Sequence, residues 1–324
     1  MIFVVWGVST IVFLLLNIVP RNPATAMAAG QLPTEEQIAA FNKRWGFDKP
    51  LWQRYFHYYS YVLRGDLGVS IYSEEPVFDE IKKYYPYTFE LATFSILISL
   101  FGGIFLGIIS ALKRNTLIDH VVRVFSLVGV SMPSFWLGIL LLLFFYVHLG
   151  FTGPGRLALG LSVKDITGFI LLDSILTGNW IAFWDGFKRL LLPAFAIGYR
   201  GIGMVSRITR SNVLEIMEKE YVKAAIARGI VRSRVTLGYV LRNALIPVVT
   251  ILGILYGAYL GGSIVIEVVF SRPGIGYFGY HSILKLDHPS ILGITLIVTV
   301  SYSFINFLVD VLYRFIDPRI KFDL

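Results

Sequence analysis

The sequence predicts an all-α polytopic membrane protein that crosses the bilayer six times. Hydrophobic residues make up 56% of its 324 residues, against about 45–50% in soluble domains. Charged residues make up 15%, where about 25% is usual. A soluble fold of this length could not hide so much apolar surface while keeping so few charges outside. These observations exclude an ordinary soluble enzyme and a disordered chain.

Apolar runs place the predicted spans, since a hydrocarbon core of about 30 Å needs about 20 helical residues. A less clean sixth span is predicted near Gly186–Val205, and Arg200 is the one basic residue that lies well inside it. Ile166–Trp184 is predicted to be an interfacial or re-entrant piece, because a seventh span there would move the most basic loop outside. The five runs without Asp, Glu, Lys or Arg are Met1–Pro20, Leu91–Leu112, Val124–Gly155, Asn243–Ile266 and His288–Val309.

Basic residues set the predicted orientation, because cytoplasmic loops are enriched in Lys and Arg. With both termini inside, the basic stretch 207–242 also lies inside. The net charge of +8 is then explained by membrane topology rather than by nucleic acid. The predicted division is a first transmembrane helix over residues 1–20, an extracytoplasmic subdomain over 21–90, a core with five transmembrane helices over 91–313, and a cytoplasmic tail over 314–324.

The predicted external subdomain is rich in aromatic residues, and it should contain short helices over Pro33–Phe41 and Trp52–Leu63. Two roles are open for it, a cap that stabilises the bundle and a docking surface for an external partner. The triplet Ala24-Thr25-Ala26 could pass for a signal-peptidase site. The preceding apolar run exceeds a usual signal core of about 7–15 residues, so we predict an uncleaved first helix.

The loop 207–242 carries the main functional signal. We predict a helix over Val213–Arg228, because acidic residues lie toward its start, basic residues toward its end, and Glu215 and Lys219 can pair at i, i+4. Small residues near its end would let it approach another surface closely, and Gly229 can end it with a positive φ. The loop is therefore predicted to dock into a cytoplasmic protein. The alternative is a solvated basic loop.

The residues Glu220–Gly229, followed by Leu241–Pro247, resemble the coupling loop of ABC importer permeases, and within that family the dipeptide/oligopeptide branch. Lys223 stands where the general pattern has Glu, and the distance from Gly229 to Pro247 is longer. Both departures from the general pattern resemble features of the peptide branch. Further segments resemble the family in order along nearly the whole chain, namely Gly65–Ser70, Ser131–Gly138, Gly261–Gly276 and Asp310–Arg319.

This resemblance implies a type I importer permease fold and one half of a translocation pore for di/oligopeptides. It implies as partners a homologous second permease, two ABC ATPase subunits and an extracytoplasmic solute-binding protein. The sequence has no G-x-x-x-x-G-K-[ST] phosphate loop. We therefore expect no enzyme activity and no cofactor on this chain, with ATP and Mg on the partner ATPases. No metal site is expected either, since there is no Cys and the five His lack ligand spacing.

Alternative functions are an oligosaccharide importer of the same type, less favourably a nickel importer, and a secondary transporter. An intramembrane enzyme is disfavoured because no catalytic pair lies in the predicted spans.

The resemblance and the spacing together give candidate residues. ATPase coupling is assigned to Glu220, Tyr221, Ala224, Ala225, Ala227 and Gly229. Arg200 and Glu267 are candidates for the substrate path, although Arg200 could instead snorkel or pair with an acid. Asn306 and Asp310 are gating or structural candidates, with an Asp310–Arg314 pair as the simpler role.

Overall fold

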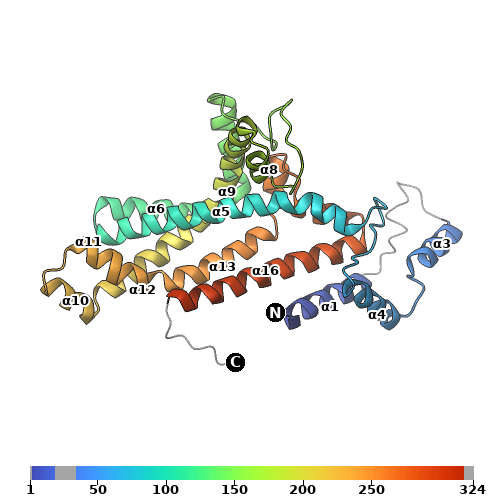
Figure 1. The fold of residues 1–324 in the computed structure, drawn as a ribbon, viewed down its shortest axis with the longest axis horizontal. Helices are drawn as coiled ribbons and strands as arrows, with labels where there is room; N and C mark the ends of the chain where they lie inside the picture. Colours follow the sequence, from blue (N-terminus) through green and yellow to red (C-terminus); the bar gives the residue numbers. More distant parts are fainter. Residues whose placement is uncertain (1, 19–33, 317–324) are drawn as a thin grey trace. The chain divides into compact units, whose positions relative to one another are not determined.

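The computed structural model describes residues 2–18 and 34–316, and every regular element in those ranges is a helix (Figure 1). The chain forms two compact units. The first combines Met1–Thr88 with Pro273–Ser303, and the second combines Phe89–Arg272 with Phe304–Leu324. The predicted division by membrane topology cuts the chain differently, and it stays a prediction. Both Ala24-Thr25-Ala26 and most of the predicted tail lie outside the described residues.

The first unit contains the N-terminal helices and a later stretch of the chain, Pro273–Ser303. The predicted short helices are present as α3 and α4, shifted by a few residues. The elements are α1 (Ile2–Ile18), α3 (Glu35–Trp45), α4 (Leu51–Val62), the start of α5 (Val77–Leu112), α15 (Ile275–Leu284) and the start of α16 (His288–Ile316).

The second unit carries most of the apolar helices. Its longest helix is α9, which has Pro193 in its interior and so loses one helical hydrogen bond there. Besides the remainder of α5 and α16, the elements are α6 (Leu117–Ser131), α7 (Ser134–Leu141), the π-helix η1 (Leu142–His148), α8 (Ile170–Leu176), α9 (Trp180–Met217), α10 (Glu220–Ala227), α11 (Arg232–Arg234), the π-helix η2 (Val235–Leu241), α12 (Arg242–Ala244), α13 (Ile246–Leu260) and α14 (Ile264–Val269).

By length and composition, two helices in the described part could cross a membrane, Val77–Leu112 and His288–Val311. The number rises to four if each of two bent helix pairs is one span. The apolar α1 is shorter, with 17 residues. The predicted span Gly186–Val205 lies wholly within α9.

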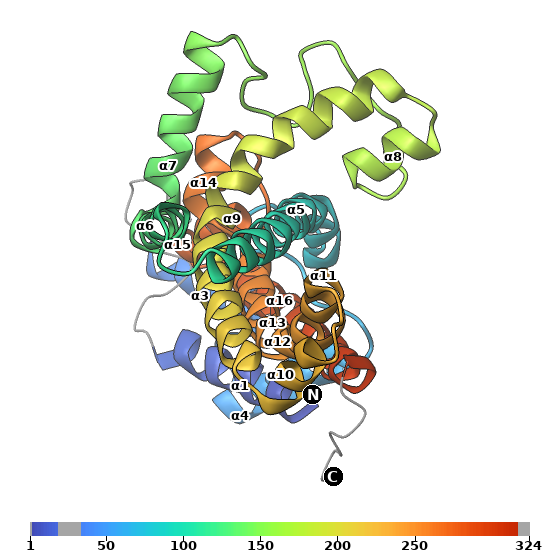
Figure 2. The same cartoon turned by 90° about the vertical axis from the view of Figure 1, so that its left-hand side faces the viewer.

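The predicted run Val124–Gly155 is not one straight helix. Its two halves, α6 and α7 with η1, meet at an angle of 107°, and α7 leaves α6 sharply (Figure 2). Met132 has extended backbone angles (φ −81°, ψ 128°) and directly precedes Pro133. A residue before proline is pushed away from the helical region, which explains the break.

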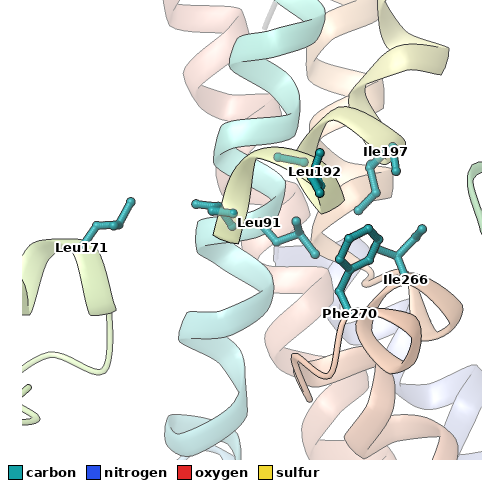
Figure 3. Packing of buried hydrophobic residues seen from close by; sticks show 9 residues of the cluster. Leu91, Leu171, Leu192, Ile197, Ile266 and Phe270 are labelled. Atoms are coloured by element: carbon teal, nitrogen blue, oxygen red, sulfur yellow. The ribbon is translucent and has the colours of Figure 1, made fainter. Parts of the chain in front are cut away.

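A cluster of buried aliphatic and aromatic side chains ties α9 to its neighbours in the second unit. It includes Leu91 of α5 and Leu192 of α9. Ile266 and Phe270 are directed toward Ile197 (Figure 3). The cluster therefore fixes α14 and α5 against the middle of α9.

Helices α6 and α9 approach each other so closely that their backbones touch through glycine. A Cβ on Gly129 would lie 2.9 Å from the carbonyl oxygen of Tyr199, and one on Gly203 would collide with the carbonyl oxygen of Ser126. The Ser126 and Ser206 hydroxyls hydrogen-bond across the contact at 2.5 Å. Small residues allow this approach in lipid, where close packing drives helix association.

We expect Gly203→Ala to destabilise the protein by about 1–3 kcal/mol, since the added methyl group must push α6 away from α9. Thermal inactivation in detergent, followed by size-exclusion chromatography, measures the effect. The control is Gly238→Ala in η2, where a Cβ would meet nothing within 4 Å. Equal melting of the two variants would contradict the tight contact.

In the first unit, Asp287 anchors the segment that precedes α5. Its carboxylate accepts hydrogen bonds from Ser70 Oγ (2.6 Å), the Ile71 backbone N–H (3.0 Å) and Ser290 Oγ (2.8 Å). The carboxylate, which is 2% exposed at the residue level, is thereby satisfied in the interior. This contact holds part of the predicted subdomain 21–90 to the residue before α16.

Candidate functional site

The predicted docking segment is a separate helix, α10, which follows α9 after two residues. The single helix predicted over Val213–Arg228 is wrong, because the chain breaks at Glu218 and Lys219. Lys219 has extended backbone angles (φ −70°, ψ 144°), so it starts a new helix in another direction. Figure 1 shows α10, α11 and α12 gathered at the end of α9.

The end of α10 follows the prediction. Gly229 has φ +79°. The Gly229 N–H donates to the Ile226 carbonyl at 2.9 Å, and the Ile230 N–H donates to the Ala225 carbonyl at 3.3 Å. Only a residue without a Cβ adopts this left-handed conformation at little cost. Gly229 therefore ends the helix through its own backbone conformation and through hydrogen bonds within this chain.

The two sides of α10 differ in what they contact. Val222 and Ala225 are buried, and they pack with Val213 of α9. On the other side, Tyr221 and Ala224 are exposed. The cluster under α10 also contains Ala111, Val235, Val240 and Ala244. One side of α10 is thus covered by the chain itself.

This arrangement divides the predicted coupling residues. Ala224 and Ala227 lie on the free side of α10, together with exposed Glu220. Tyr221 is exposed at the edge of this side, and its hydroxyl accepts a hydrogen bond from Asn243 Nδ2 at 3.3 Å. Ala225, which is 5% exposed, faces the chain's own core. Because Ala225 is almost fully covered by this chain, its side chain contacts α9 and η2 rather than a free surface, and its coupling role stays a prediction. The exposed apolar Ile226 was not among the predicted residues.

Exposed ion pairs surround α10. Lys223 Nζ lies 2.8 Å from Glu220 Oε1, and the hydrogen bond and charge of this carboxylate raise the pKa of Lys223. The predicted Glu215–Lys219 pair is present at 3.0 Å. Such solvated pairs contribute little stability. At the start of α10, the free side therefore carries a positive and a negative charge, from Lys223 and Glu220.

A buried ion pair, which sequence reasoning missed, fixes α9 just before α10. Asp119, at the start of α6, is 0% exposed. Its two carboxylate oxygens accept hydrogen bonds from Arg210 Nε and a terminal guanidinium nitrogen, both at 2.8 Å. Ser110 Oγ at the end of α5 (2.5 Å) and the Asn115 backbone N–H (3.0 Å) also donate to this carboxylate. Arg123 Nε lies farther away, 3.7 Å from Oδ1. We call Asp119, Arg210, Ser110 and Asn115 the Asp119 clamp.

The Asp119 clamp joins three helices at one point. A bidentate arginine–carboxylate pair fixes both distance and orientation. Arg210 lies seven residues before the end of α9 at Met217, so the clamp holds the part of α9 that leads into α10. The signal in the sequence was an aspartate in the first turn of a largely apolar helix, which needs a partner when buried.

The predicted substrate-path residues do not lie in comparable surroundings. Arg200 is exposed on α9, as a residue lining a path or meeting a partner would be. Glu267 of α14 is 1% exposed, so its side chain has no free surface in this chain. Neither observation tests the predicted role.

The two gating or structural candidates lie on the second-unit part of α16. Asn306 is half-buried and Asp310 is exposed. The side chain of Arg314 lies outside the described residues, so the predicted Asp310–Arg314 pair stays a prediction.

A second buried charge cluster lies where α5, α8 and two loops meet. One Glu90 carboxylate oxygen is 3.3 Å from Arg156 and 3.6 Å from Arg272, and the other accepts the Leu171 backbone N–H at 3.0 Å. Arg272 and Glu90 are both buried. This cluster pins the loop before α8 and the loop after α14 to α5.

Asp173 organises the segment predicted to be interfacial or re-entrant. Burial alone would raise the pKa of Asp173, but hydrogen bonds from the Thr167 hydroxyl (2.6 Å) and the N–H groups of Thr167 (2.9 Å) and Gly168 (3.1 Å) hold it below its usual value. The segment contains only the short helix α8 before α9 begins.

Comparison with known proteins places these features in context. Residues 103–322 match the family described as "Binding-protein-dependent transport system inner membrane component". Residues 1–92 match the family of N-terminal parts of such membrane components. The two matches leave few residues of the chain uncovered.

Similar sequences come from bacterial permeases. The chain is 39% identical to "Probable D,D-dipeptide transport system permease protein DdpB" of Escherichia coli (strain K12), over 99% of this chain and 94% of the relative. It is 38% identical to "Di/tripeptide transport system permease protein DppB" of Pseudomonas aeruginosa (strain UCBPP-PA14), over 98% and 94%. It is 34% identical to "Glutathione transport system permease protein GsiC" of Pectobacterium atrosepticum, over 97% and 94%.

A solved structure supports the fold. A chain in inward-facing structures of the MetNI methionine ABC transporter has a TM-score of 0.53 and 16% identity, covering 73% of this chain and 96% of that chain. The predicted all-α importer-permease fold is confirmed at the level of architecture.

Proposed function

Because this chain belongs to the family of binding-protein-dependent transport system inner membrane components, and is a multi-pass permease subunit of an ABC importer, we propose that it forms half of a pore for di/oligopeptides. The observation that carries the substrate class is the full-length identity of 35–39% to permeases described as dipeptide or di/tripeptide transporters. A relative described as a glutathione permease also transports a peptide.

The other subunits of the transporter are part of the same proposal. A homologous permease completes the pore, two ATPase subunits bind ATP and Mg, and an extracytoplasmic protein delivers the peptide. Both termini lie in the cytoplasm. The chain itself performs no hydrolysis. Its own contribution is the free side of α10, which offers a short docking surface that begins beside the Lys223–Glu220 ion pair.

The geometry supports a transmission route from α10. Only two residues separate α10 from α9. The Asp119 clamp ties that end of α9 to α5 and α6, so a displacement of α10 is passed to all three helices. ATP-driven closure of the two ATPase subunits would then rotate these helices, and the pore would open alternately to one side of the membrane and to the other.

Uptake by the reconstituted transporter tests the function. We expect ATP-dependent accumulation of a labelled dipeptide that requires all four membrane-associated subunits and the binding protein. Oligosaccharide or nickel accumulation in its place would overturn the substrate class. Uptake driven by an ion gradient without ATP would favour a secondary transporter.

Site-specific crosslinking tests the orientation of α10, and it is direct because the natural chain contains no cysteine. We expect Ala224→Cys to form crosslinks with an ATPase subunit in assembled membranes, because residue 224 is on the free side. Ala225→Cys should give at least about tenfold less product, because it faces Val213 and Val222. Equal crosslinking at both positions, or a partner other than the ATPase, would contradict the docking surface.

A further inference from the structure

Three kinds of side chain occupy separate sides of α4. At about 100° per helical residue, one side packs on α1, the next is apolar and exposed, and the third is polar and exposed. The packed side holds Tyr55, Tyr58 and Tyr59, the apolar side holds Trp52, Phe56 and Leu63, and the polar side holds Gln53, Ser60 and Arg64.

The apolar side of α4 is a stripe without cover from the described chain. Trp52 is 61% exposed, Phe56 is 66% exposed, and Leu63, which follows the last turn, is 85% exposed. These three residues fall within a sector of about 40° when the helix is viewed along its axis. We call them the α4 stripe. An apolar stripe beside a polar face is typical of a helix that lies in a membrane–water interface.

Hydroxyl groups fix α4 against α1. The Trp6 indole N–H donates to the Tyr55 hydroxyl at 3.1 Å. The Tyr59 hydroxyl lies 2.7 Å from Ser9 Oγ and 2.8 Å from Thr10 Oγ1. Polar contacts of this kind join helices in an apolar solvent, where the hydroxyls have no water to bind. The position of α4 beside α1 is therefore specified by the sequence.

Aromatic packing extends the same contact. The Phe13 ring is edge-on to Tyr55 with centroids 5.5 Å apart, and it stacks on Tyr58 at 5.8 Å. Phe13 is buried by these rings. The contacts thus run over two turns of α1, from Trp6 to Phe13.

The surroundings of the α4 stripe favour lipid over protein as its partner. Helix α1 has no charged residue, and its free surface presents large apolar side chains, including Phe3, Ile11 and Leu15. That surface suits hydrocarbon. A soluble protein reaching the stripe would have to enter the edge of the same hydrocarbon layer. The one cationic side chain within α4, Arg54, stacks on the Phe47 ring at 4.5 Å instead of extending from the stripe.

We propose that α4 is an interfacial anchor, with the α4 stripe inserted among lipid acyl chains and the Gln53–Ser60 side facing water. The segment after α1 is then held at the membrane surface beside α1. This inference requires only that α1 lies in the membrane, and it is independent of the transported substrate.

Nitroxide labels in the assembled transporter test the proposal. Single cysteines are introduced at positions 52, 56 and 63 of the stripe and at 53 and 60 of the polar side. The complex is reconstituted in phosphatidylcholine vesicles containing anionic lipid. Oxygen, which concentrates in lipid, and a nickel chelate, which stays in water, are the two relaxation probes. All five side chains are exposed in the chain, so labelling should leave the fold intact.

We expect oxygen to dominate at positions 52, 56 and 63 and the nickel chelate to dominate at 53 and 60, with Phe56→Cys and Ser60→Cys as the matched pair. Equal nickel accessibility at 56 and 60 would overturn the anchor. Protection of residue 56 only after the solute-binding protein is added would also overturn it, and would identify a protein-docking surface. Failure of peptide uptake alone would bear on the proposed function and leave this result unchanged.

Discussion

Ala225→Trp is expected to lower ATP-driven peptide uptake by at least about tenfold while the spans remain folded. The indole cannot fit under α10, where Ala225 is 5% exposed and packs with Val213 and Val222. Overpacking a core of this kind costs about 1–3 kcal/mol or more. Since α10 is joined to the rest of the chain by short connections, the strain is most easily relieved by lifting α10 off α9.

The comparison with Ala224→Trp separates positioning from contact. Residue 224 is on the free side, so its indole should block the ATPase subunit directly without disturbing the cluster around Val222. Uptake is measured together with ATP hydrolysis and with protease cleavage at Arg228. Both variants should lose uptake, but only Ala225→Trp should expose the α10 segment to protease. Full uptake in Ala225→Trp would show that α10 tolerates displacement and is not the coupling element.

Asp119→Ala is expected to give the largest loss of stability of any single substitution considered. It leaves Arg210, Ser110 and the Asn115 N–H without their shared acceptor. Removing one partner of a buried ion pair costs about 3–5 kcal/mol. The lower end applies, because Arg210 is 21% exposed and can gain water.

The matched control is Glu218→Gln at the end of the same α9 helix. Its pair with Arg114 is long, at 3.3 Å, and its two side chains are 54% and 71% exposed. Such a pair contributes about 0–1 kcal/mol, so the control should melt close to the natural protein. Apparent melting temperatures in detergent measure both variants. In membranes, Asp119→Asn should retain assembly better than Asp119→Ala and still reduce uptake per ATP hydrolysed. An unchanged melting temperature for Asp119→Ala would remove the clamp.

Sequence patterns predicted the apolar elements well because membrane insertion imposes strong local requirements. Long uncharged runs became α5 and α16, and Gly229 ended α10 with a positive φ as its lack of a Cβ allows. The all-α importer fold followed from the ordered motifs together with these runs, and comparison with related chains confirms it.

Long-range contacts were beyond the reach of the same patterns. The sequence around Asp119 does not predict Arg210 as its ion-pair partner, because the two residues meet only when α6 packs on α9. The inward direction of Ala225 depends in the same way on Val235 and Val240 of η2. The break at Met132 was readable in principle from Pro133, but an uninterrupted apolar run outweighed it.

The interior proline of α9 removes one helical hydrogen bond, and it therefore marks a position where the helix bends more easily. From Pro193 to Met217 the helix is roughly 36 Å long at 1.5 Å per residue. A rotation of this part of α9 by only about ten degrees about Pro193 would move Met217 by roughly 6 Å. A displacement of a few ångströms at the α10 end of α9 would therefore need only a small rotation of the helix at Pro193.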